Sequence, residues 1–80
     1  MHKKTLIENI DKIHTTEMGI GRIQRNLDID AEPVEYCISK LKHENSVVTK
    51  EGKNYYVNVD DCMITINSSS FTIITAHKSK

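Results

Sequence analysis

The sequence has few of the residues that disulfide frameworks, metal sites and membrane helices require. Its 80 residues include no Trp, one Phe, one Pro, three Gly and two Cys. Cys37 and Cys62 have no Cys-x-x-Cys spacing and no His at ligand spacing, so we expect two buried, reduced thiols in a cytoplasmic protein. No apolar run approaches the roughly 20 residues that a membrane-spanning helix needs. The sequence therefore predicts no membrane association.

An excess of charge of one sign is also lacking. The chain carries 11 Lys and Arg against 11 Asp and Glu, and neither its helical part nor the remainder is a basic module. Proteins that hold nucleic acid unspecifically usually have a basic excess, because phosphate contacts supply most of that affinity. Gly19-Ile20-Gly21 lacks a third glycine and follows no strand, so it is no dinucleotide fingerprint. With no nucleophile motif either, we expect no catalytic residue, metal or cofactor.

The first part of the chain has the periodicity of helices. Thr5-Leu6-Ile7-Glu8 has the spacing of a capping box, which predicts a first helix from Thr5 to about Ile13. Thr15 and Thr16 suit the N-cap of a second helix. The expected buried stripe of this second helix consists of Ile20, Ile23 and Leu27.

A third helix gives the clearest periodic signal. It is predicted to start between Asp30 and Pro33, because proline is tolerated in the first turn. Apolar residues then recur at i, i+3, i+4 and i+7, namely at Val34, Cys37, Ile38 and Leu41. Asn45 is expected to end the helix, because Asn tolerates the left-handed conformation.

After this helix the period changes from 3.6 to 2, as in strands. The expected turns are Glu51-Gly52, Asp60-Asp61 and Ser68-Ser69-Ser70, and they separate strands beginning near Val47, Tyr55, Cys62 and Phe71. Turns this short permit only antiparallel neighbours. The prediction is one α+β domain over residues 1–80. Helices occupy about 5–44 and a three- to four-stranded antiparallel β-meander about 47–77, with the helices on one sheet face.

Several segments are similar to one known family. They are Lys12–Glu17, Gly52–Val57, Ile64–Asn67 and Thr72–Lys78, together with Arg22, Ile23, Asn26 and Leu27. They resemble domain of unknown function 3781, which occurs in bacteria and in their phages and mobile elements, and the resemblance spans nearly the whole chain. Some members are associated with inhibition of CRISPR effectors. The resemblance therefore implies a small phage-type protein whose partner is a CRISPR effector or its RNA-bound complex.

The leading hypothesis for function is an interaction protein that binds a protein partner stoichiometrically. Such a protein needs a rigid surface rather than a catalytic group, and Tyr and Arg are favoured interface anchors. The candidate partner-binding residues are Arg22, Arg25, Lys53, Asn54, Tyr56, Asn58, Thr65, Asn67, Thr75 and His77. A second copy of the chain is a further candidate partner, because an exposed last strand can pair with its own copy.

Two alternatives stay open. The order of helices followed by a hairpin also fits a winged-helix nucleic-acid-binding regulator, which would need Arg22, Arg25, Lys50 and Lys53 to gather beside the third helix. A small metal-independent ribonuclease would instead need His14 or His77 close to Arg22 or Lys53, with Thr65 and Thr75 as hydroxyl donors.

Overall fold

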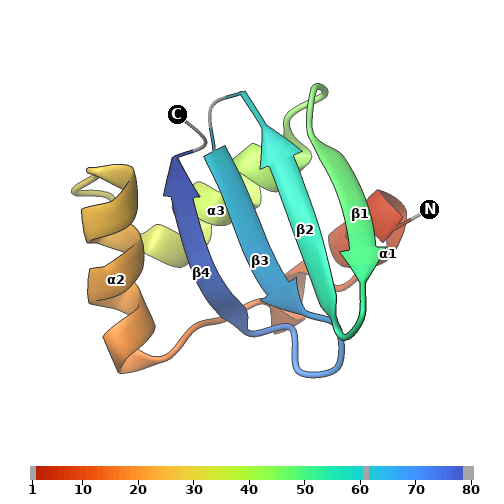
Figure 1. The fold of residues 1–80 in the computed structure, drawn as a ribbon, viewed down its shortest axis with the longest axis horizontal. Helices are drawn as coiled ribbons and strands as arrows, with labels where there is room; N and C mark the ends of the chain where they lie inside the picture. The colour runs from red at the N-terminus through yellow and green to blue at the C-terminus, as the bar shows by residue number, and fades with distance from the viewer. Residues whose placement is uncertain (1, 61, 79–80) are drawn as a thin grey trace.

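The α+β class is confirmed by the computed structural model, which describes residues 2–60 and 62–78 (Figure 1). Its elements are α1 (His2–Glu8), the 3₁₀ segment η1 (Ile10–Lys12), α2 (Glu17–Leu27), α3 (Pro33–Lys42), β1 (Val47–Glu51), β2 (Asn54–Val59), β3 (Cys62–Asn67) and β4 (Ile73–Lys78). The strands form one antiparallel sheet in the order β1-β2-β3-β4. Within the described residues, no helix is both long and apolar enough to cross a membrane.

The first helix lies earlier in the chain than the capping box predicts. α1 already includes His2, so Thr5 lies inside the helix and the expected capping box at Thr5–Glu8 is wrong. Long-range contacts hold α1 in place, because Leu6 is fully buried and the Lys3 ammonium donates to the His43 carbonyl at 2.9 Å. Tertiary packing thus overrides the local signal.

The predicted cap of α2 is confirmed at Thr16, but its buried stripe differs by one residue. The Thr16 hydroxyl accepts a hydrogen bond from the Gly19 amide at 3.0 Å, as an N-cap should. Ile20 is 39 % exposed, so its predicted burial is wrong. Gly19 occupies the buried position instead, because a Cβ there would collide with the Thr15 hydroxyl.

α3 begins at the predicted Pro33 and packs against the sheet. Glu32 caps it, and its carboxylate accepts hydrogen bonds from the Val34 and Glu35 amides. The helix ends at Lys42 with His43 as its C-cap, so the expected end at Asn45 is too late. Its predicted stripe faces the core: Cys37 and Leu41 are buried, and Val34 and Ile38 pack against them.

The β1–β2 turn is shifted by one residue from the predicted Glu51-Gly52. Glu51 pairs with Asn54, so the two loop residues are Gly52 and Lys53. Gly52 has φ +61°, the left-handed value expected of glycine at the first central position of a type II′ turn. At the next turn, Asp60 also has positive φ (52°), and Asp61 lies outside the described residues.

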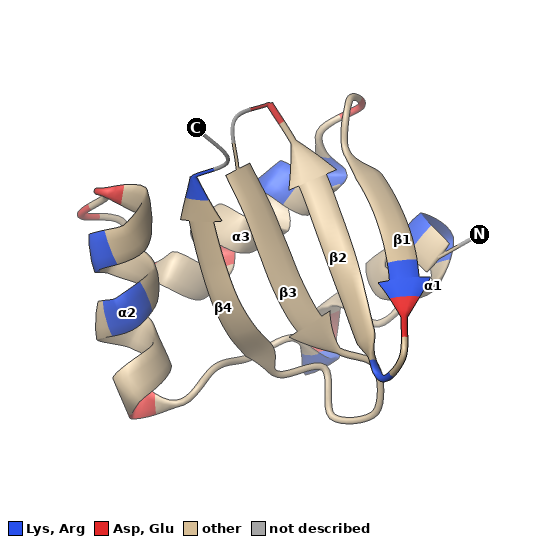
Figure 2. Cartoon of the chain, viewed as in Figure 1, with Lys and Arg blue, Asp and Glu red and all other residues tan. Residues whose placement is uncertain are grey.

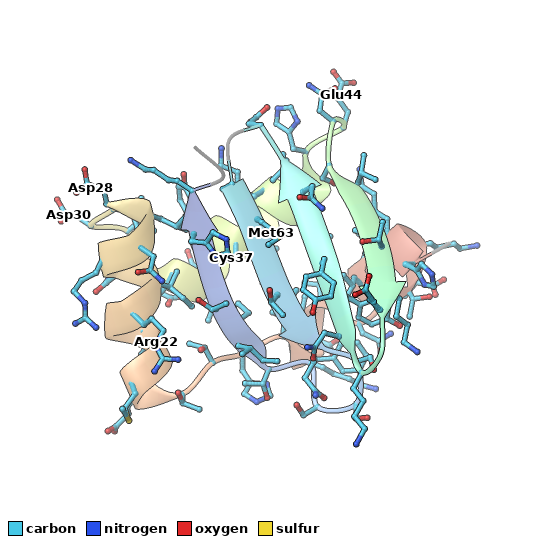
Figure 3. The ribbon with its side chains drawn as sticks, in the orientation of Figure 1. Arg22, Asp28, Asp30, Cys37, Glu44 and Met63 are labelled. Atoms are coloured by element: carbon cyan, nitrogen blue, oxygen red, sulfur yellow. The ribbon has the colours of Figure 1, made fainter. Side chains whose placement is uncertain are left out.

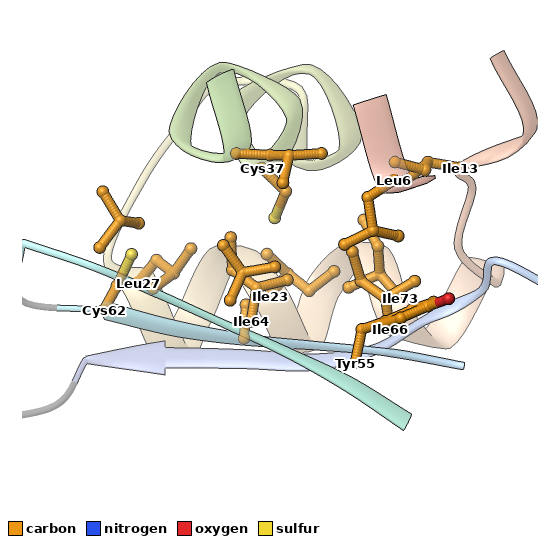
Figure 4. Packing of buried hydrophobic residues seen from close by; sticks show 14 residues of the cluster. Leu6, Ile13, Ile23, Leu27, Cys37, Tyr55, Cys62, Ile64, Ile66 and Ile73 are labelled. Carbon is orange, nitrogen blue, oxygen red and sulfur yellow. The ribbon is translucent and has the colours of Figure 1, made fainter. Parts of the chain in front are cut away.

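The helices occupy two positions around the sheet. α1 and α3 lie behind it, whereas α2 lies beside β4 (Figure 1). Placement of all three helices on one sheet face is therefore not confirmed. The core lies between the sheet and the helices, where Ile23 of α2 and Cys37 of α3 lie near Ile64 of β3, and Leu6 of α1 lies near Ile66 (Figure 4).

Candidate functional site

One face of the sheet is turned away from α1 and α3. Because side chains alternate along a strand, the strand register assigns every second residue of β1, β2 and β3 to this surface, which we call the open face. In β4 the alternation is interrupted by a register shift opposite Thr65 and Ile66, so that only Thr75 and His77 are assigned to it by their partners. Its members are Val47, Thr49, Glu51, Asn54, Tyr56, Asn58, Met63, Thr65, Asn67, Thr75 and His77. The candidate residues that the sequence placed on the strands therefore all lie on one surface.

Three cross-strand rows make up the open face. The central row is Thr49, Tyr56, Thr65 and Thr75. The row nearer the β2–β3 turn is Val47, Asn58, Met63 and His77. The row at the opposite end is Glu51, Asn54 and Asn67. Residues directly opposite one another contact across strands, so each row is a continuous strip of surface.

Exposure separates the residues that a partner can reach from those that support them. Asn58 is exposed, and Tyr56 and Met63 are half-buried on neighbouring strands. Thr65 is only 6 % exposed, because it lies between Tyr56 and Thr75 in its row. Met63, labelled on the near side of β3 in Figure 3, was not among the candidates; its alternation with the buried Ile64 was the signal that could have found it.

The open face carries almost no charge. Glu51 is its one carboxylate, His77 is its one histidine, and it has no Lys or Arg. Lys50 and Lys78 fall on the opposite side by register. Figure 2 shows the strands as mostly uncharged, with charged residues concentrated on the helices, at strand ends and in turns.

Asn67 has a structural role. Its side-chain oxygen accepts hydrogen bonds from the Ser69 and Ser70 amides, both at 2.9 Å, and from the Ser70 hydroxyl at 3.2 Å. Phe71 takes a left-handed φ of 58° in the same loop. The carboxamide oxygen of Asn67 therefore holds the β3–β4 loop.

The basic candidates lie at opposite edges of the sheet. Arg22 and Arg25 are exposed on α2, beside β4, with Arg22 labelled in Figure 3. Lys50 and Lys53 belong to the β1–β2 hairpin at the other edge. The clustering beside α3 that would favour nucleic acid is therefore not seen among these residues.

The two candidate histidines lie at opposite ends of β4. His77 pairs with Met63 near the end of that strand. His14 instead forms a parallel bridge to Thr72, just before the strand begins. Within residues 2–60 and 62–78, no recorded hydrogen bond or ion pair joins either histidine to Arg22 or Lys53. Among the described residues, no such contact supports the ribonuclease alternative.

The two cysteines and a hollow on α1 lie away from the open face. Cys37 and Cys62 belong to the same buried cluster (Figure 4). Burial, the neighbouring Cys62 thiol and Glu32 together raise the pKa of Cys37 to about 12. A shallow hollow is lined by α1 residues Lys3, Lys4, Ile7 and Glu8. No group of three or more metal-ligating side chains occurs among the described residues.

Comparison with known proteins identifies the family of the chain. Residues 7–77 match a family described as protein of unknown function (DUF3781). The chain belongs to the DUF3781 family. For this DUF3781 protein, no curated protein gives a significant match, and no solved structure does either. The family description assigns no activity, so function has to be argued from the open face.

Proposed function

We propose that this DUF3781 protein is a small interaction protein that binds a protein partner stoichiometrically through its open face. The observation that carries the proposal is the composition of that face. Tyr56, Met63 and Asn58 lie on adjacent strands in a surface that has one carboxylate and no Lys or Arg.

This composition suits a protein partner. Protein interfaces are enriched in Tyr, Met and Arg, and their central parts are depleted of charged residues. Tyr56 and Met63 supply the apolar contact area, and Arg22 lies beside β4 as a flanking charged anchor. A face that served only to contact water would carry more Lys and Glu.

The resemblance supports a first choice of partner. We take it to be a CRISPR effector or its RNA-bound complex, which makes the chain a candidate anti-CRISPR inhibitor of phage or mobile-element type acting in the cytoplasm. Inhibition of this kind requires only that the chain bind a surface of the effector, without catalysing a reaction. Nucleic-acid binding and ribonuclease activity stay alternatives that no contact in the structure favours.

The test is affinity capture of the tagged protein from a bacterial lysate, with and without nuclease, and from cells that express CRISPR effectors. Asn58→Lys places a charge on the open face, and we expect it to weaken capture of the partner about 30-fold, as a loss of about 2 kcal/mol implies. Tyr56→Ala should act in the same direction. Ser39→Lys adds the same charge on the exposed side of α3 and should leave capture unchanged.

Two results would contradict the proposal. The first is a partner that is captured equally well by Asn58→Lys, Tyr56→Ala and the unaltered chain. The second is recovery of nucleic acid alone, with no protein that survives nuclease treatment. Either result would favour the alternatives. CRISPR interference that persists when the chain is co-expressed with each effector would remove the effector as the partner.

A further inference from the structure

The two edges of the sheet are not equivalent. α2 lies beside β4, and the His14–Thr72 bridge adds a short parallel pairing at the start of that edge (Figure 1). β1 forms the other edge, and its first residue, Val47, is 59 % exposed. An uncovered edge strand presents unpaired backbone groups to any strand that can align with it.

The β1–β2 turn determines which backbone groups of β1 face outward. In a hairpin with a two-residue loop, the closing pair exchanges its backbone hydrogen bonds, and the closing pair here is Glu51 and Asn54. Hydrogen-bonded and non-hydrogen-bonded pairs alternate along an antiparallel ladder. Thr49 therefore also bonds inward to β2, whereas Val48 and Lys50 direct their N–H and C=O groups away from the sheet.

Val48 is the first residue of β1 whose outward N–H and C=O groups are available for pairing with another strand. The preceding outward position is Ser46, but its amide donates to the His43 carbonyl at 3.0 Å. The Ser46 carbonyl accepts from the Lys3 ammonium at 3.3 Å. The free edge of β1 is therefore the short stretch from Val48 to Lys50.

Only one symmetric register uses this stretch fully. Two-fold antiparallel self-pairing centred on Lys50 would place two ammonium groups opposite each other. Centring on Val48 would require the occupied groups of Ser46. Centring on Thr49 pairs Val48 with Lys50 of the second copy, twice, and places the two Thr49 residues opposite each other, a favourable pair in sheets.

The helix behind β1 is self-complementary under the same symmetry. α1 lies behind β1 at this edge of the molecule (Figure 1), and it carries the hollow lined by Lys3, Lys4, Ile7 and Glu8. Lys4 and Glu8 are exposed one helical turn apart on α1, and Ile7 is 39 % exposed. A two-fold axis through Thr49 turns α1 antiparallel to its copy, which brings Lys4 of each toward Glu8 of the other.

We propose that two copies of this chain form a two-fold dimer through antiparallel pairing of β1 centred on Thr49, with α1 packing against its copy. The pairing joins the two four-stranded sheets into one. The inference does not depend on the proposed function. It leaves both open faces accessible and places them side by side.

The first test measures mass and register together. Light scattering over a concentration series should give twice 9.2 kDa as concentration rises. In the proposed register the Cα atoms of the two Thr49 residues lie about 4.5 Å apart, within disulfide range. Thr49→Cys should therefore form an intersubunit disulfide at least 10-fold faster than the matched control Asn58→Cys, an exposed residue on β2. A monomer at all concentrations, or equal cross-linking by both variants, would overturn the proposal.

The second test removes one outward donor and leaves the β1–β2 ladder intact. Lys50→Pro deletes an N–H that points away from the sheet, a position where proline is tolerated. We expect at least a 10-fold loss of dimer affinity, whereas Lys50→Ala should keep the dimer. Circular dichroism should show that both variants are folded. A folded Lys50→Pro protein that dimerises as tightly as Lys50→Ala would refute the β1 interface.

Discussion

His14 lies where the connection between α1 and α2 crosses the start of β4. Its amide donates to the Phe71 carbonyl at 3.2 Å, and its carbonyl accepts from the Ile73 amide at 2.7 Å. The ring Nδ1 lies 2.8 Å from the Lys12 carbonyl, so Nδ1 carries the hydrogen. In the neutral ring, Nε2 then accepts from the Thr72 hydroxyl at 3.1 Å. This histidine is therefore a structural clamp.

The clamp gives a prediction about stability. His14→Ala should lower the free energy of unfolding by about 1 kcal/mol, the usual net value of a hydrogen bond. Thr72→Val should act similarly, and the double variant should lose less than the sum, because both changes remove the same contact. Urea unfolding measures all three, with His77→Ala on the open face as the control. Additive losses would show that the side chains act independently.

The raised pKa of Cys37 predicts that the stability of the chain depends on pH. Burial, the nearby Cys62 thiol and Glu32 raise the pKa of Cys37 from 9.0 to about 12, so between these values the unfolded chain has lost a proton that the folded chain retains. The contribution of this thiol to stability is therefore fully present below pH 9. It falls as pH rises toward 12, by at most about 1.4 kcal/mol per unit.

The measurement compares the unaltered chain with Cys37→Ala. The difference in unfolding free energy between them should be constant from pH 6 to about pH 8. Above about pH 9 the unaltered chain should lose stability relative to Cys37→Ala. A difference that stays constant to pH 11 would mean that Cys37 ionises as readily in the folded chain as in the unfolded one.

At the scale of elements, the two glycines of α2 have opposite roles. A Cβ at Gly19 would collide with the Thr15 hydroxyl, which cannot swing aside without losing its 3.0 Å hydrogen bond to the Ile73 carbonyl. A Cβ at Gly21 would meet only the Arg25 guanidinium, at 3.7 Å. The first glycine permits the close approach of α2 to its N-terminal connection, whereas the second has no such role.

This contrast gives a matched pair of variants. Gly21→Ala should raise the melting temperature, because alanine is favoured over glycine in a helix by up to about 1 kcal/mol. Gly19→Ala should lower it despite the same gain in helix propensity. If both variants raise it, Thr15 can move freely, and the close approach has no energetic consequence.

Local signals predicted the elements better than their limits. The sequence predicted the cap at Thr16, the stripe of α3 around Cys37 and the alternation of β2, because each depends only on residues a few positions apart in the chain. The start of α1 was not, since it depends on burial of Leu6 and on Lys3 reaching the α3–β1 connection. Such contacts join residues far apart in the chain and leave no local pattern.

At the scale of the whole molecule, the strand register brings the strand candidates onto one face. Alternation alone puts Tyr56 and Asn58 on the same side of β2, and pairing adds Thr75 and His77. The positions of Arg22 and Arg25 could not be predicted in this way. They depend on α2 lying beside β4, and nothing in the local sequence of α2 indicates which element will receive its apolar stripe.

The pairing of α2 with β4 also concerns how the chain is made. α2 is synthesised well before β4, and its buried residues Ile23 and Leu27 have their neighbouring strand only when β4 has followed. On the ribosome, α2 is therefore an amphipathic helix without its final neighbour, while the hairpin of β1 and β2 can already form from adjacent segments. A nascent chain should thus present this helix to chaperones until the last strand emerges and closes the sheet edge.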